Sequence, residues 1–266
     1  MCELLAMSAQ SPTNLTLSLN ELVEHSAGNG PADGWGVAYY QGNDARRIRD
    51  TSAATDSPWS RFVEQQGLTS QIVIAHIRRA TQGATSLNNT QPFTRELGGR
   101  LHVFAHNGDL PALLDFDNYQ YQNFRPIGTS DSERVFCQLL DRLRDAWLDQ
   151  KKKPSFDCRW GVFKDLCAEM RPLGPANFLY SDGEYLFAHA NKRTQADGVR
   201  RPPGLNYLCR SCQPDSKISG KAVSVGGEQA VVLVASRPLS NEAWQAMAEG
   251  ELLALHNGHI LAQSTV

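Results

Sequence analysis

The sequence lacks the features that mark membrane, secreted and nucleic-acid-binding proteins. Its best apolar run, Ala230 to Ala235, has the length of a strand and falls far short of the roughly 18 residues that a spanning helix needs. The segment Met1 to Ser8 has no positive charge and too short an apolar stretch for a secretory signal. With 26 Lys and Arg against 28 Asp and Glu, no global basic field favours nucleic acid. We therefore expect a cytoplasmic protein that binds neither membranes nor nucleic acids.

The sequence also lacks an internal repeat and a disulfide framework. A chain of 266 residues can bury a sizeable core without disulfides, so its 6 cysteines are expected to be reduced. Cys209 and Cys212 have metal-ligand spacing, but Cys158 and Cys167, which would complete a site, are too far apart in sequence for a typical second pair. We expect no metal and no cofactor; a zinc-stabilised binding module remains an alternative.

Hydrophobic periodicity predicts strands at both ends of the chain and helices between them. Ser130 and Glu133 have the spacing of a capping box, and the residues after them repeat with helical period, which predicts a helix over 131–148. Two groups of strands without regular βαβ alternation indicate an α+β fold with mainly antiparallel sheets, and we treat 1–266 as one domain. The other expected helices cover 15–25 and 156–170, and the expected strands cover 2–8, 33–40, 71–77, 101–106, 176–181, 184–190, 205–210, 229–236 and a hairpin over 251–262 that turns at Asn257-Gly258.

Cys2 is the first candidate for chemistry. A small second residue normally permits removal of Met1, which would leave a thiol and a free α-amine in one residue. The unperturbed pKa of an α-amine, about 7.7–8.0, makes it a proton acceptor near neutral pH. The alternative interpretation is that position 2 holds a small residue without a chemical role.

Three further segments end a predicted strand or open a predicted helix: Ala75 to Thr81, Ala105 to Leu110 and Gly128 to Glu133. Together with Cys2 and Gly34-Trp35-Gly36, they resemble the class II glutamine amidotransferase domain of the N-terminal nucleophile hydrolases. The start Met-Cys-Glu-Leu-Leu-Ala, Ala235 to Leu239 and Glu251 to Leu253 look most like its small stand-alone members. This resemblance covers nearly the whole chain and implies a four-layer αββα sandwich of two mainly antiparallel sheets.

The resemblance also assigns catalytic roles. Cys2 would attack the side-chain amide of glutamine and form a thioester, while its α-amine passes the proton to the departing ammonia. The Asn107 side-chain amide and the Gly108 backbone N–H would stabilise the negative charge that develops on the carbonyl oxygen. A glycine suits this second position because the backbone must approach the substrate closely and can need a positive φ.

The amino-acid head of the substrate is a zwitterion, for which the resemblance supplies one cation and one anion. Arg78 would hold the α-carboxylate through a two-pronged contact, and Asp131, in the first turn of the predicted helix, would hold the α-ammonium. Thr81 would line the same pocket. Without the resemblance, Arg78 and Arg79 would be read as surface charges, Asp131 as part of a helix cap, and Trp35 and the histidines His76, His106 and His256 as core residues.

The predicted function is therefore hydrolysis of glutamine or another γ-glutamyl amide, which releases glutamate and ammonia or an amine. No segment is left over for a domain that consumes ammonia, so a separate synthetase is a possible partner. Glu3 and Arg79 stand where larger members commonly carry glycine and tyrosine. These differences leave the identity of the substrate's leaving group undetermined. The alternative is a non-catalytic or partner-dependent subunit that binds a γ-glutamyl metabolite, especially if Met1 is retained.

Overall fold

The structure, a computed structural model, describes residues 2–15, 19, 21–23, 33–79, 85–114, 122–149, 152–212 and 229–266. Its helices are α2 (Pro58–Gln66), α3 (Asp131–Leu148) and α4 (Phe156–Met170), with short 3₁₀ turns at Leu87–Asn89, Pro111–Leu113 and Arg171–Leu173. Its strands are β1 (Glu3–Asn14), β2 (Trp35–Gln41), β3 (Asp44–Asp50), β4 (Thr69–Ile77), β5 (Phe93–Glu96), β6 (Leu101–Gly108), β7 (Ala176–Ser181), β8 (Leu186–His189), β9 (Arg193–Thr194), β10 (Arg200–Arg201), β11 (Asn206–Cys212), β12 (Gln229–Ala235), β13 (Gln245–Ala246), β14 (Glu251–His256) and β15 (His259–Thr265).

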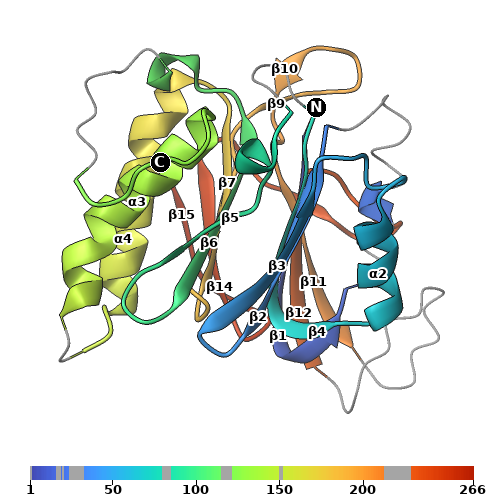
Figure 1. Ribbon diagram of the computed structural model, residues 1–266, viewed down its shortest axis with the longest axis horizontal. Coiled ribbons are helices and arrows are strands. Elements are labelled where there is room, and N and C mark those ends of the chain that lie inside the picture. Colours follow the sequence, from blue (N-terminus) through green and yellow to red (C-terminus); the bar gives the residue numbers. More distant parts are fainter. Residues whose placement is uncertain are drawn as a thin grey trace.

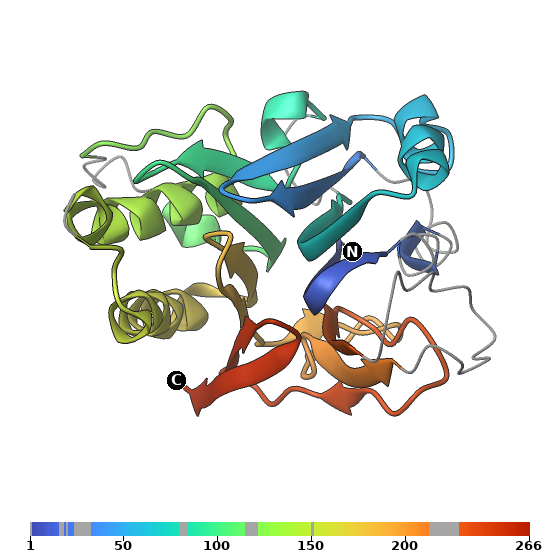
Figure 2. The ribbon, with the colours of Figure 1, turned by 90° about the horizontal axis from the view of Figure 1, so that it is seen from below.

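Two antiparallel sheets pack face to face between helices. Sheet A has the order β13-β11-β12-β1-β4-β2-β3, and sheet B has the order β15-β14-β8-β7-β6-β5. Figure 1 shows α3 and α4 on the outer face of sheet B and α2 on the outer face of sheet A, and Figure 2 shows the same layers from below. The expected α+β sandwich of four layers is therefore confirmed.

The apolar side chains of β1 explain why it is central. It pairs with β4 on one side and β12 on the other, so its alternate residues enter two different cores. Leu4 and Ala6 pack against sheet B residues such as Val103, whereas Leu5 and Met7 pack on the outer face of sheet A. Burial on both faces holds this strand in the middle of sheet A, and its start lies at one end of the sandwich (Figure 1).

Most of the expected elements are present. The helix predicted over 131–148 has those bounds, and the Ser130 hydroxyl accepts the Glu133 N–H at 3.2 Å as a capping box requires. The helix predicted over 156–170 also has its expected bounds. The helix predicted over 15–25 falls largely outside the described residues. Within that range, Leu19 and Glu21 to Val23 are described and are helical. No described helix is long and apolar enough to cross a bilayer.

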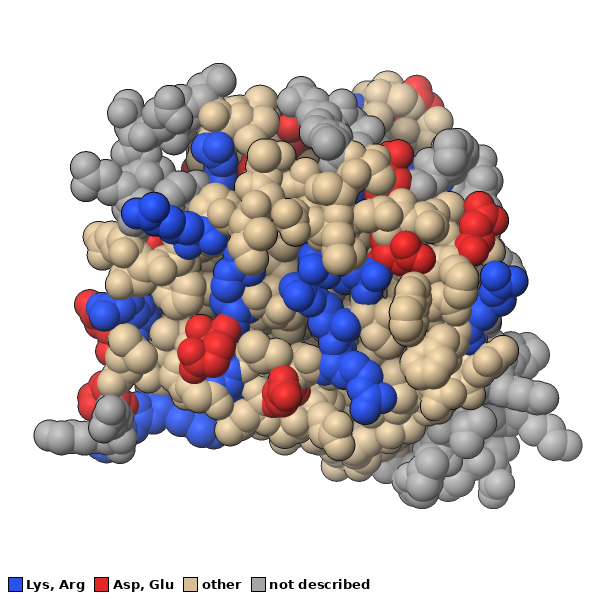
Figure 3. Space-filling model, viewed as in Figure 1, with Lys and Arg blue, Asp and Glu red and all other residues tan. Residues whose placement is uncertain are grey.

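Positive side chains are not spread evenly over the surface. In Figure 3, Lys and Arg side chains gather in the middle of the face, in front of the edge strand β3. That strand has the sequence DARRIRD, and its Arg46 and Arg47 are exposed. The net charge of −2 does not reveal this local concentration.

Candidate active site

Cys2 lines a cleft of about 290 Å³ at one end of the sandwich. The antiparallel pairing of Glu3 with Ile77 brings Cys2 beside the residues that follow β4. The Arg79 N–H donates to Cys2 Sγ at 3.3 Å, and the Cys2 thiol points to the Arg79 carbonyl oxygen at 3.4 Å. The backbone after β4 therefore fixes the position of the sulfur.

The surroundings of Cys2 favour the neutral thiol. Burial raises the pKa of Cys2 above its usual 9.0, although the hydrogen bond from the Arg79 backbone and the charge of Arg78 act in the opposite direction. At neutral pH the sulfur is therefore protonated. A reaction at this sulfur requires a proton acceptor close to it.

Asn107 and Gly108 form the end of β6, in the sheet opposite Cys2. The Asn107 Nδ2 donates to the Cys2 carbonyl oxygen at 2.7 Å, so the proposed nucleophile and one proposed oxyanion donor are in direct contact. Gly108 lies in β6 and has no positive φ, so of the two reasons for a glycine there, backbone freedom does not apply. The site requires glycine for a different reason: a Cβ there would overlap the Pro175 carbonyl oxygen of the neighbouring strand end.

Arg78 and Arg79 are not surface charges. Their exposures are only 6% and 9%, and both line the cleft that contains Cys2. The backbone of Arg78 is anchored, since its N–H donates to the Gly34 carbonyl at 2.8 Å and its carbonyl accepts the Asp33 N–H at 2.9 Å. Thr81, the other residue predicted in this segment, lies outside the described residues.

Asp131 lines the cleft from the first turn of α3. Its two carboxylate oxygens accept the Leu110 N–H at 2.6 Å and the Ser132 N–H at 2.7 Å. The carboxylate is thus held in place by the loop after β6 and by the first turn of α3. A carboxylate has about four acceptor positions, so these bonds leave capacity for an ammonium donor.

His76 and His106 are buried near the site, as the sequence predicts, whereas His256 is only half-buried and lines a second, larger cavity, so the expectation of a core residue is wrong there. His106 contacts the Ser132 hydroxyl at 3.0 Å and the Pro175 carbonyl at 3.1 Å, and burial lowers its pKa. His76 is 1% exposed, and neither of its ring nitrogens has a hydrogen-bond partner among the described residues. His256 is half-buried and contacts the Glu184 carbonyl at 3.0 Å.

Sequence reasoning did not identify the buried charges behind Cys2. Glu3 is 2% exposed, and its Oε1 lies 3.3 Å from Arg193 Nη2 and 3.3 Å from Arg237 Nε. Ser236, 1% exposed, accepts the Leu4 N–H on its hydroxyl at 3.0 Å. The only local sign was Glu3 at a position where an apolar residue fits the strand pattern, because its partners are far away in sequence.

Gln91 is a further cleft residue that was missed. Its side chain accepts the His106 N–H at 2.6 Å and donates to the His106 carbonyl at 3.2 Å, which holds the end of β6. Gly36 makes room for this segment, because a Cβ at Gly36 would overlap the Gln91 carbonyl oxygen. Gly36 of the Gly34-Trp35-Gly36 segment is therefore needed because the Gln91 backbone packs directly against it. Trp35, between the two glycines, is a core residue as expected.

The cysteines outside the cleft do not converge. Cys158 and Cys167 lie on α4, outside sheet B, whereas Cys209 lies on β11 in sheet A. No group of three or more potential metal-ligating side chains occurs in the part of the chain that the structure describes. The zinc module built from these cysteines is therefore not supported by their positions.

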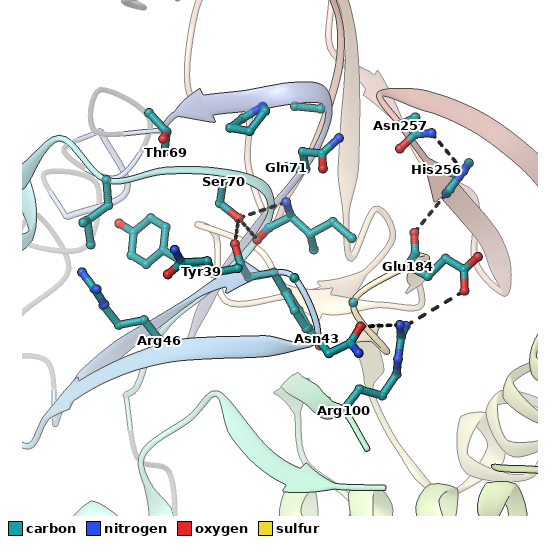
Figure 4. Close-up of a pocket in the computed structure, with 18 of the residues that line it drawn as sticks. Tyr39, Asn43, Arg46, Thr69, Ser70, Gln71, Arg100, Glu184, His256 and Asn257 are labelled. Atoms are coloured by element: carbon teal, nitrogen blue, oxygen red, sulfur yellow. Dashed lines mark hydrogen bonds and ion pairs between the residues drawn. The ribbon is translucent and has the colours of Figure 1, made fainter. Parts of the chain in front are cut away.

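A larger cavity, of about 830 Å³, lies near the other end of β1 (Figure 4). Its Arg100 already donates to the Asp182 carbonyl and to Asn43, and its Lys153 lies 3.6 Å from Glu184. Its described lining contains no thiol. This cavity therefore lacks the chemistry of the Cys2 cleft.

Comparisons with known proteins agree with the geometry. The sequence profile of the class II glutamine amidotransferases matches residues 1–266. The chain is 36% identical, over 94% of its length and 96% of the relative, to an Escherichia coli K12 protein described as "Putative glutamine amidotransferase YafJ".

Solved structures show the same relationship. The crystal structure of a predicted glutamine amidotransferase from Pseudomonas aeruginosa matches with a TM-score of 0.69 and 30% identity, covering 98% of this chain and 100% of that one. Glutamine phosphoribosylpyrophosphate amidotransferase from Bacillus subtilis shares the fold, with a TM-score of 0.59 and 14% identity, over 99% of this chain and 49% of that one. On the evidence of its whole-length match and its fold, the chain belongs to the class II glutamine amidotransferases.

Proposed function

We propose that the protein hydrolyses the side-chain amide of glutamine or of another γ-glutamyl amide through a thioester on Cys2. The observation that carries this proposal is the contact between the two sheets at the cleft: Cys2 at the start of β1 lies against Asn107 at the end of β6, with Arg78 and Asp131 lining the same cleft.

In the proposed reaction, the Cys2 sulfur forms a bond to the amide carbon, and its proton passes through the α-amine to the departing nitrogen as the C–N bond breaks. Water then cleaves the thioester, which releases glutamate and restores the thiol. Because burial raises the thiol pKa, this mechanism requires a base, and the α-amine of the same residue supplies one when Met1 has been removed. His106 is a poorer candidate, since both of its ring nitrogens are engaged elsewhere.

Substrate recognition follows from the two charges. Arg78 would bind the α-carboxylate and Asp131 the α-ammonium, a pairing that reads the glutamyl head and leaves the amine side open. We further propose that residues 1–266 act as one catalytic unit in the cytoplasm, and that any ammonia that is not released passes to a separate synthetase.

The test is a panel of γ-glutamyl amides, glutamine included, incubated with protein whose N-terminus has been identified by mass spectrometry. Processed protein is expected to release glutamate together with ammonia or the matching amine, and Cys2→Ala is expected to abolish this with an unchanged circular dichroism spectrum. The matched control is Cys158→Ala, which removes an exposed thiol on α4. Full turnover in Cys2→Ala protein contradicts the mechanism, and a retained Met1 with binding but no turnover favours the non-catalytic alternative.

A further inference from the structure

The side-chain amide of Asn107 is fixed by two acceptors. Its Nδ2 donates to the Cys2 carbonyl oxygen at 2.7 Å and to the Ser236 hydroxyl oxygen at 3.0 Å, and the residue is only 5% exposed. An amide nitrogen carries two hydrogens, so these two bonds use both of them. The Asn107 side chain cannot rotate without giving up both partners.

Ser236 is itself held from several directions. It follows β12, and its N–H donates to the Leu4 carbonyl at 3.0 Å while its hydroxyl accepts the Leu4 N–H at 3.0 Å. Its carbonyl accepts Arg193 Nη1 at 2.6 Å and Asn206 Nδ2 at 3.2 Å. The hydroxyl that contacts Asn107 therefore has a position defined by β1, β9 and β11.

The same cluster reaches the strand that carries the nucleophile. Arg193 contacts both the Ser236 carbonyl and the Glu3 carboxylate, and Glu3 is the residue next to Cys2. Arg193 and Glu3 are 3% and 2% exposed, so this contact is largely excluded from water and its geometry is tightly restrained. Cys2 and Asn107 are thus both anchored to one buried polar cluster.

We propose that Ser236 is a positioning residue that sets the Asn107 amide for the charge that develops during amide hydrolysis. This rests on the proposed function, in which Asn107 donates to the oxyanion. In the resting site the Nδ2 hydrogens are shared by a carbonyl and a neutral hydroxyl. An oxyanion is a stronger acceptor than a neutral hydroxyl, so transfer of an Nδ2 hydrogen bond from Ser236 to an oxyanion formed beside Cys2 is favourable.

The proposal predicts an effect on the chemical step and little effect on binding. Ser236→Ala is expected to lower kcat by about 10- to 100-fold with KM nearly unchanged, less than the roughly 100- to 1,000-fold expected for Asn107→Ala. Because Ser236 acts through Asn107, adding Ser236→Ala to Asn107→Ala is expected to cost no more than about twofold further. Ser236→Thr, which keeps a hydroxyl, is expected to recover most of the lost kcat.

The control is Ser8→Ala. Ser8 is fully buried in β1, six residues after Cys2, and its hydroxyl accepts the Gly258 N–H at 3.2 Å. It is expected to leave kcat unchanged. The proposal is overturned by an unchanged or higher kcat in Ser236→Ala, by an equal loss in Ser8→Ala, or by fully additive losses with Asn107→Ala.

Failure of the proposed function gives a different result. If identified, processed wild-type protein hydrolyses no member of the γ-glutamyl panel, both proposals fall together. If the wild type turns over substrate and Ser236→Ala does so equally well, only the role of Ser236 is refuted.

Discussion

The buried pair of Glu3 and Arg193 gives a prediction about stability that does not depend on the proposed chemistry. Glu3→Gln keeps the shape of the side chain and removes its charge, which leaves the 3% exposed guanidinium of Arg193 without an anion. Burial already lowers the pKa of Arg193, and Glu3 is the main group opposing that shift. In the variant, the free-energy cost of burying the Arg193 charge is no longer offset by Glu3, so the folded state is destabilised.

The expected magnitude follows from the contacts. Removing one partner of a buried ion pair costs about 3–5 kcal/mol of unfolding free energy, and we expect the lower end, about 3 kcal/mol, because Arg193 keeps its bond to the Ser236 carbonyl. With a urea slope of about 3 kcal/mol/M, the unfolding midpoint should fall by about 1 M. Tryptophan fluorescence during urea unfolding measures this directly.

A matched variant separates burial from charge. Glu169→Gln removes a carboxylate that also pairs with an arginine, Arg142, but is 56% exposed, so its expected cost is about 0–1 kcal/mol. In a double-mutant cycle, Glu3→Gln and Arg193→Met should together cost clearly less than the sum of the single changes. If Glu3→Gln and Glu169→Gln cost the same within about 0.5 kcal/mol, the reasoning from burial is refuted.

Two further predictions concern binding and pH. Arg78→Lys replaces a planar fork by a point charge and should raise KM for glutamine by about 10- to 100-fold with little change in kcat, whereas an unchanged KM in steady-state kinetics removes Arg78 from the carboxylate role. Burial, together with the charges of His106 and Arg78, lowers the pKa of His76 from 6.5 to about 3. Between pH 6.5 and pH 3 the unfolded chain therefore binds a proton at His76 that the folded chain does not bind. The free energy of unfolding consequently falls as the pH falls through this range. His76→Leu should therefore lose stability less steeply than wild type between pH 7 and pH 5 in urea titrations, by up to about 1.4 kcal/mol per pH unit, and parallel pH profiles would exclude this.

Elements with strong local patterns could be predicted from the sequence. The Ser130 cap and the repeated apolar face predict helix α3. Asn257-Gly258 predicts the β14–β15 hairpin, and the φ angles of these two residues, 48° and 75°, suit a tight turn. Strand β3 was missed because DARRIRD is dominated by charges, as suits an exposed sheet edge. Helix α2 was missed because it is short and five of its nine residues are polar or charged.

The site divides in the same way. The resemblance located Cys2, Arg78 and Asp131, which line one cleft, and Asn107, whose side chain contacts the backbone of Cys2. The supporting residues could not be found, because Glu3 and Arg193 are 190 positions apart and Leu4 and Ser236 are 232 apart. Neither contact leaves a local pattern, since the first depends on where β9 lies relative to β1 and the second on how β12 aligns with β1 in sheet A.

The position of the polar cluster also explains how two sheets can hold one site. The space between the sheets is filled by apolar side chains such as Leu4 and Val103, where an unpaired polar group would be costly. At the end of the sandwich, the Asn107–Cys2 contact joins sheet B to sheet A, and the Ser236 hydroxyl ties the same amide to the neighbouring strand end. A relative shift of the sheets would therefore break both bonds at once. The packing of the apolar core thus sets the geometry between Cys2 and Asn107, so core substitutions far from the cleft should lower kcat before they unfold the protein.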